Sequence, residues 1–178
     1  MNVVAIGGRF ACAALLCACA WRTEDGDPVE VPISLEFPSS TAAVTVDSVS
    51  IYAFEGGQCQ ALMQEYRSNR SSRGDGIGTF SQSAVLESDI CSIFEGKAKA
   101  TLPLGTYALV AIATGPEGYA NGQPTAVHDY FTGCVEQTVG GAAAVLPITM
   151  ALATDVKPAF KSSCTSLKQY CERSCPGT

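Results

Sequence analysis

The sequence predicts a mainly β protein, a two-sheet antiparallel sandwich of about seven strands with a short cysteine-rich helix at its C-terminus. Segments in which apolar and polar residues alternate recur along the chain, and glycine-rich or polar turns separate them. Only two stretches have the spacing of a helix. With 178 residues, the chain is long enough for one domain plus appendages, and a domain of about 150 residues buries roughly 70% of its unfolded surface.

The first strand is predicted at residues 29–37, "VEVPISLEF". Its apolar face consists of every second residue: Val29, Val31, Ile33, Leu35 and Phe37. Pro32 lies on the opposite face and has no backbone N–H, which indicates an edge strand.

Six further strands are expected at 44–54, 80–86, 96–102, 106–113, 126–139 and 144–153. The stretch "YALVAIA" is apolar on both faces and should form a central strand. Between the strands, "CQALMQEY" places Cys59, Leu62, Met63 and Tyr66 on one face of a helix. In the tail, Cys164, Leu167, Cys171 and Cys175 recur at helical spacing, with Ser163 as the expected N-cap.

The N-terminus has the order of a signal peptide. Arg9 is the one charged side chain among the first 21 residues, and an apolar run follows it. Only 12 uncharged residues separate Arg9 from Arg22, whereas a membrane-spanning helix needs about 20. We therefore expect residues 1–18 to be removed.

Leu16-Cys17-Ala18-Cys19 resembles the lipobox of bacterial lipoproteins. This resemblance implies that Cys19 becomes the first residue and carries lipid, including palmitate. Because Ala20 rather than Asp follows Cys19, it also implies anchoring to the outer membrane, with the periplasmic or surface face left open. An ordinary cleaved signal in which Cys19 is incidental is the alternative. The predicted organisation is 1–18 signal peptide, 19–28 anchor and tether, 29–156 sandwich domain and 157–178 tail.

Cysteine counting agrees with export. Of nine cysteines, two lie in the signal peptide and one would carry lipid. The remaining six are expected to form disulfides: Cys59, Cys91, Cys134, Cys164, Cys171 and Cys175. Their 15 pairings cannot be distinguished from the sequence. A zinc site at the last three is the alternative, but their intervals of six and three residues do not match the paired spacing of structural zinc sites.

The segment "LPLGTYALVAIA", residues 102–113, resembles the strand-turn-strand of transthyretin-like and carboxypeptidase-regulatory-like domains. Pro103 fixes one backbone angle, Gly105 can adopt a positive φ, and Tyr107 is expected to pack over the turn. The resemblance implies an Ig-like or transthyretin-like sandwich. Together with "TGCVEQTVGGAAAVLPITMAL", it makes the chain similar to small, uncharacterised lipoproteins of predatory and soil Gram-negative bacteria.

Candidate chemistry is sparse. A net charge of -6 disfavours nucleic acid as a partner. His128 is adjacent to Asp129, but neighbours on a strand point to opposite faces and do not form a catalytic pair by themselves. The acidic "DGDP" at 25–28 lacks the remaining ligands of a calcium loop. We expect no catalytic residues, no metal and no cofactor.

The segment 66–78, "YRSNRSSRGDGIG", is expected to be a polar loop and a candidate partner-binding site. Its cations are Arg67, Arg70 and Arg73, whose planar donor groups suit carboxylates, and Arg73-Gly74-Asp75 resembles the integrin-binding tripeptide. The sequence thus favours a non-catalytic envelope lipoprotein that binds a protein or glycan or has a structural role. A small hydrolase or inhibitor acting on envelope or prey material is the alternative.

Overall fold

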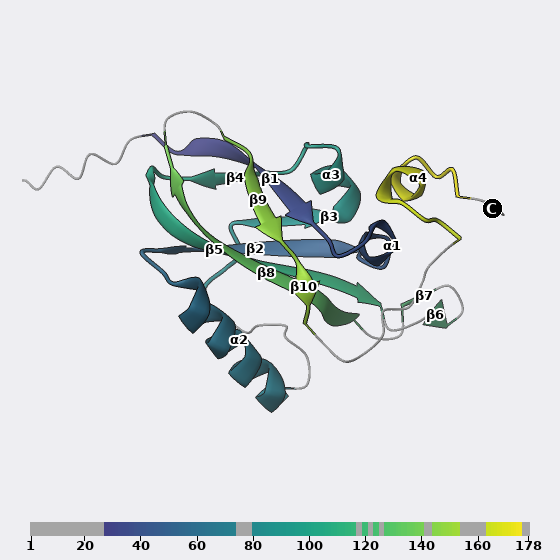
Figure 1. Cartoon of the computed structure of the whole chain (residues 1–178), viewed down its shortest axis with the longest axis horizontal. Coiled ribbons are helices and arrows are strands. Elements are labelled where there is room, and N and C mark those ends of the chain that lie inside the picture. The colour runs from purple at the N-terminus through teal and green to yellow at the C-terminus, as the bar shows by residue number, and fades with distance from the viewer. Residues whose placement is uncertain are drawn as a thin grey trace, which may run out of the picture.

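The computed structural model describes residues 27–73, 80–116, 119–120, 123–124, 127–140, 144–153 and 163–175. The predicted signal peptide, Cys19 and most of the tether lie outside these ranges. Within them the chain forms the following elements (Figure 1): β1 (Val29–Glu36), α1 (Ser40–Ala43), β2 (Ser48–Glu55), α2 (Cys59–Arg73), β3 (Leu86–Asp89), α3 (Ile90–Phe94), β4 (Lys99–Leu102), β5 (Gly105–Pro116), β6 (Tyr119–Ala120), β7 (Gln123–Pro124), β8 (Val127–Val139), β9 (Leu146–Thr149), β10 (Ala151–Leu152) and α4 (Leu167–Cys171).

Two sheets dominate the fold, so the prediction of a mainly β protein with two sheets is confirmed. The larger sheet has the order β10-β8-β5-β2-β3 and is antiparallel throughout. The smaller has the order β4-β1-β9, in which β4 is antiparallel and β9 parallel to β1. The expectation of purely antiparallel pairing therefore fails at one pair, because β9 reaches β1 from a distant part of the chain and local alternation carries no information on its direction.

The main core is shared by the two sheets. Alternate residues of β1 and β9, including Val31, Ile33 and Ile148, belong to the same buried cluster as Ile51 and Leu109 from the larger sheet. A second cluster covers the other face of the larger sheet beneath α2. The β5 strand is buried on both faces, as expected for the central strand predicted at 106–113.

Pro32 does not mark an edge strand, because β1 is the middle strand of its sheet. Its position is nevertheless compatible with the missing N–H. Pro32 is the last residue of β1 in register with β4, and pairing with β9 begins at Ile33. The proline therefore lies where β1 changes neighbours.

Four predicted strands have wrong boundaries, among them the strand expected at 96–102, which begins only at Lys99, after α3. The strand expected at 80–86 begins only at Leu86, because Phe80 packs under α2 against the rings of Tyr52 and Phe54, at centroid distances of 5.1 and 4.9 Å. The strand expected at 44–54 begins at Ser48, after the short helix α1. The strand expected at 144–153 is divided at Met150 into β9 and β10, which belong to different sheets.

Two short helices, α1 and α3, have no counterpart among the predicted elements. Ser39 caps α1 and Asp89 caps α3, each accepting a hydrogen bond from a backbone N–H three residues later. With 4 and 5 residues, both helices are too short to produce a periodic apolar pattern.

The turn between β4 and β5 is formed largely as predicted, with one change. Tyr107 is buried and packs over the turn, since a Cβ on Gly105 would lie 3.2 Å from its ring. Among the described glycines, only Gly56 and Gly96 have a positive φ. A side chain at position 105 would therefore be crowded by the ring of Tyr107, whereas the backbone angle there does not call for glycine.

The tail helix is shorter than predicted. It begins at Leu167 and is capped by Ser166, whose hydroxyl accepts from the Gln169 N–H at 3.3 Å, so Ser163 is not its N-cap. Cys164 and Cys175 lie outside the helix, on either side of it. Within the described ranges, no helix is long and apolar enough to span a membrane.

Candidate functional site

All six cysteines assigned to disulfides are paired in the structure. The pairs are Cys59–Cys134, Cys91–Cys171 and Cys164–Cys175, with sequence separations of 75, 80 and 11 residues. The three tail cysteines proposed as an alternative zinc site are thus all used in disulfides. Among the described residues, no group of three His, Cys, Asp or Glu side chains could hold a metal ion.

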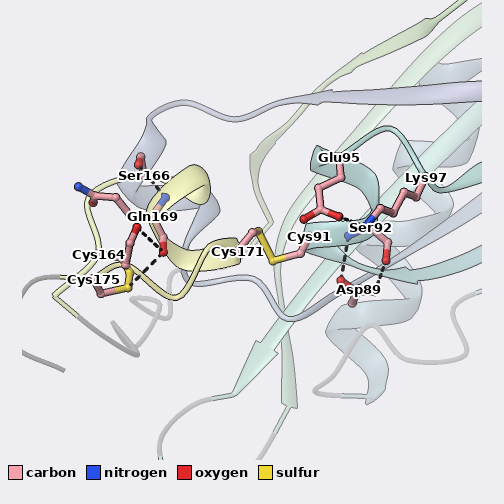
Figure 2. Close-up of a disulfide and its surroundings, with 11 residues drawn as sticks. Asp89, Cys91, Ser92, Glu95, Lys97, Cys164, Ser166, Gln169, Cys171 and Cys175 are labelled. Carbon is pink, nitrogen blue, oxygen red and sulfur yellow. Dashed lines mark hydrogen bonds and ion pairs between the residues drawn. A yellow bond between two sulfur atoms is a disulfide. The ribbon is translucent and has the colours of Figure 1, made fainter.

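The Cys91–Cys171 disulfide joins the tail to the body. It connects α3 to α4, as Figure 2 shows, with Cα atoms 5.4 Å apart. No residue of α4 is buried, although Leu167 and Tyr170 pack partly against the main core. Attachment of the tail therefore includes this crosslink and two half-buried side chains of α4.

Short hydrogen bonds order the start of α3, next to this disulfide (Figure 2). Asp89 accepts from the Ser92 N–H at 2.9 Å and from the Ser92 hydroxyl at 2.6 Å. These hydrogen bonds hold the pKa of Asp89 below its usual range. Beyond the helix, Lys97 forms an exposed ion pair with Glu95, which raises the pKa of Lys97.

An apolar groove lies beside this crosslink, between β1, α1, α3 and α4. It consists of two adjoining hollows of about 420 and 290 Å³, and both are lined by Leu35, Phe37, Phe94 and Leu167. Half of the surface of Phe94 is exposed (50%). This apolar groove is a candidate binding surface.

A second groove of about 450 Å³ separates α2 from β8 and β10. Cys59, Thr132 and Leu152 are among its lining residues, and Arg67 lies at the same groove. The Cys59–Cys134 disulfide attaches the start of α2 to β8. Compared with the apolar groove, this one has a larger share of polar lining groups.

Beneath α2, a buried pair of polar side chains joins the helix to the sheet. The Tyr66 hydroxyl donates to the Asp129 Oδ2 at 2.9 Å, and both residues are 1% exposed. Burial, together with the negative charge of Asp129, raises the pKa of Tyr66 far above its usual value. In the sequence, Asp129 was related only to its neighbour His128, so the Tyr66–Asp129 pair was not predicted. The apolar helical face that contains Tyr66 was the one feature that indicated a buried position for this tyrosine.

The predicted arginine loop is in large part a helix. Arg67 is exposed and Arg70 is half-buried on α2, and Arg73 is the last residue of that helix. The reason is local, since no glycine or proline interrupts the chain between Gly57 and Gly74. Gly74 and Asp75 of the predicted tripeptide lie outside the described residues.

His128 is half-buried on β8, with its ring 6.3 Å from that of Tyr130. Its neighbour Asp129 is fully buried and bonded to Tyr66. His128 lines neither groove. The structure therefore does not bring His128 and Asp129 together at a common surface.

Comparison of the chain with known proteins found no matching family model, no matching curated protein and no matching solved structure.

Proposed function

We propose that this protein is a non-catalytic lipoprotein of the Gram-negative cell envelope, anchored to the outer membrane by lipid on Cys19. The observation that carries the proposal is the pairing of all six cysteines that follow Cys19. Disulfides persist in oxidising compartments such as the periplasm and are rare in the cytosol. If residues 1–18 are removed, Cys19 is the one cysteine left outside these three disulfides, which agrees with a separate, lipid-bearing role for it.

In this proposal the domain is a β-sandwich, Ig-like or transthyretin-like, that acts as a binding or structural module. Its support is the main core, to which both sheets contribute, as in proteins whose sheets pack face to face. The turn from Leu102 to Gly105, with Tyr107 packed over it, is the part of the chain that resembles the transthyretin-like domains.

Two surfaces support a binding role for the domain. The apolar groove leaves Phe94 half exposed beside Leu35, and apolar surface gathered in a hollow is typical of binding sites. The other surface is the face of α2 that presents Arg67 and Arg70, which replaces the predicted loop as the candidate site for a protein or glycan partner. Arg73, the third arginine of the predicted site, is the last residue of the same helix.

The anchoring is tested by expressing the full chain and two serine variants in a Gram-negative host fed a palmitate analogue. The wild type and Cys17→Ser should both incorporate the label and sediment with outer membranes. Cys19→Ser should lose both properties. Cys17→Ser is the matched control, because it removes a cysteine two residues away from the proposed lipid site.

The destination is tested with Ala20→Asp, which places Asp directly after the lipid-bearing cysteine. This variant should keep the label but move to the inner-membrane fraction on a density gradient. Equal labelling of wild type and Cys19→Ser would contradict the proposed anchor, whereas labelled protein found at the inner membrane without the Asp substitution would contradict only the destination.

A further inference from the structure

On the side of β1 that faces β4, only the first half of the strand has a neighbouring strand. Along the first half, Val29 to Pro32 pair with β4. Along the second half, Ile33 to Glu36 pair with β9 on the other side. The β4 ladder ends because the chain before it turns away into α3, where the Ala98 N–H donates to the Ser92 carbonyl at 3.1 Å. In register, Ala98 would have continued the ladder opposite Ile33.

Strand geometry shows which backbone groups of β1 face the unpaired side. The Glu36 carbonyl accepts from the Met150 N–H at 2.8 Å, so Glu36 directs its backbone groups toward the β9 side. Backbone groups of successive residues in a strand point to opposite sides. Leu35 therefore directs its N–H and C=O toward the side of β4, where the described chain provides no further strand.

The apolar groove lies along this open half of β1. Its larger hollow, of about 420 Å³, runs from Pro32 to Phe37 and is closed on the opposite side by Phe94 and Leu167. Val145, which is 57% exposed, adds a further apolar wall. Unpaired backbone groups next to apolar walls are the features by which a sheet edge accepts an extended peptide as an additional strand.

We propose that the open half of β1, residues 33–37, is a strand-acceptor site for an extended segment of a partner protein. The segment would form backbone hydrogen bonds with Leu35 and place apolar side chains against Phe94. Charge favours a basic segment, because Glu36 on the same half-strand is exposed and the whole chain has a net charge of -6.

A second copy of this chain is a poorer occupant. Both copies would carry the same net charge of -6. Stable protein–protein interfaces bury about 1,200–2,000 Å². The open edge spans only residues 33–37, which is short for the interface of a stable dimer. The inference rests on the proposed binding role and gives it a location and a partner chemistry. Its test requires no lipid, so its failure is distinguishable from failure of the proposed anchor.

The first measurement is amide hydrogen exchange of the purified chain, with and without a blocked six-residue peptide that alternates lysine and valine. In the free protein, the Leu35 amide should exchange faster than that of Ser34, which faces β9. Saturating peptide should slow exchange at Leu35 at least about tenfold, because a hydrogen-bonded amide exchanges only on opening. A Leu35 amide as slow as that of Ser34 in the free protein would overturn the proposal.

Two controls separate strand addition from simple adsorption. The same peptide N-methylated at every amide cannot donate to the ladder from either edge, and it should bind at least about tenfold more weakly. Phe94→Ala should weaken binding of the unmodified peptide about fivefold or more, whereas Leu104→Ala, a 42% exposed apolar residue outside the groove, should change it less than about twofold. Equal binding of both peptides, or equal effects of both substitutions, would overturn the proposal.

Discussion

The helices α2 and α4 are both joined to the body by a disulfide, but only α2 also has a core of its own. Leu62 and Tyr66 of α2 are buried in a cluster with Phe80 and residues of β5, and Tyr66 bonds to Asp129 on β8. No residue of α4 is buried. The comparison indicates that one disulfide reinforces a packed contact, whereas the other is the principal attachment of its helix.

The largest expected effect comes from removing the two disulfides separately. In Cys91→Ser/Cys171→Ser, α4 should lose its amide protection entirely while the sheets stay folded, because α4 itself then packs on the body only through the half-buried Leu167 and Tyr170. In the matched pair Cys59→Ser/Cys134→Ser, α2 should keep its protection, although the free energy of unfolding should fall by about 2–4 kcal/mol. Hydrogen exchange by mass spectrometry distinguishes these outcomes. Loss of α2 protection in the second pair would contradict the comparison.

The next largest effect is expected at the buried pair beneath α2. Tyr66→Phe removes the hydroxyl that donates to Asp129 and should lower the free energy of unfolding by about 1–3 kcal/mol in urea. Tyr52→Phe is the control, because it removes a hydroxyl that is only partly buried and that bonds to Ser50 rather than to Asp129. An equal loss in both variants would mean that the bond to Asp129 does not attach α2.

The same pair should make stability depend on alkaline pH. Burial raises the pKa of Tyr66 above its unfolded value, with the Asp129 charge as the next cause. The folded state therefore retains the proton longer than the unfolded state, so this contribution is complete below about pH 10 and decreases as the pH rises further. Urea midpoints measured across this range should fall more steeply for the wild type than for Tyr66→Phe. Parallel curves would contradict the assignment.

The smallest expected effect is at the cap of α3, beside the tail disulfide. Asp89→Ala removes the side chain that accepts from Ser92 and should reduce stability by about 0.5–1 kcal/mol. Because the pKa of Asp89 is lowered in the folded state, its contribution is present above the unfolded pKa and is lost as the pH falls through the folded value. Asp89→Asn, which keeps a capping oxygen, should recover most of the loss at neutral pH in the same urea titration.

Local sequence patterns were sufficient to predict the buried faces of single strands and helices. The alternation from Val29 to Phe37 predicted β1, and the apolar run in 107–113 predicted the strand that is buried on both sides. The helical face that contains Leu62 and Tyr66 likewise predicted the packed side of α2. In each case, burial follows directly from the period of the side chains.

Features formed between distant segments could not be predicted in the same way. The parallel pairing of β1 with β9 and the disulfides Cys59–Cys134 and Cys91–Cys171 depend on contacts across the chain. The apolar groove requires α3 and α4 to meet beside β1, and α3 is too short to be recognised by periodicity. The absence of helix-breaking residues before Gly74 was a readable signal that Arg67 and Arg70 belong to a helix.

The most direct test of the central claim is intact mass spectrometry of the protein isolated from Gram-negative membranes, before and after reduction and alkylation. The account predicts a chain that begins at Cys19 and carries acyl groups, with six further cysteines alkylated only after reduction. An unlipidated chain whose cysteines are alkylated without reduction would contradict both the proposed anchor and the three disulfides.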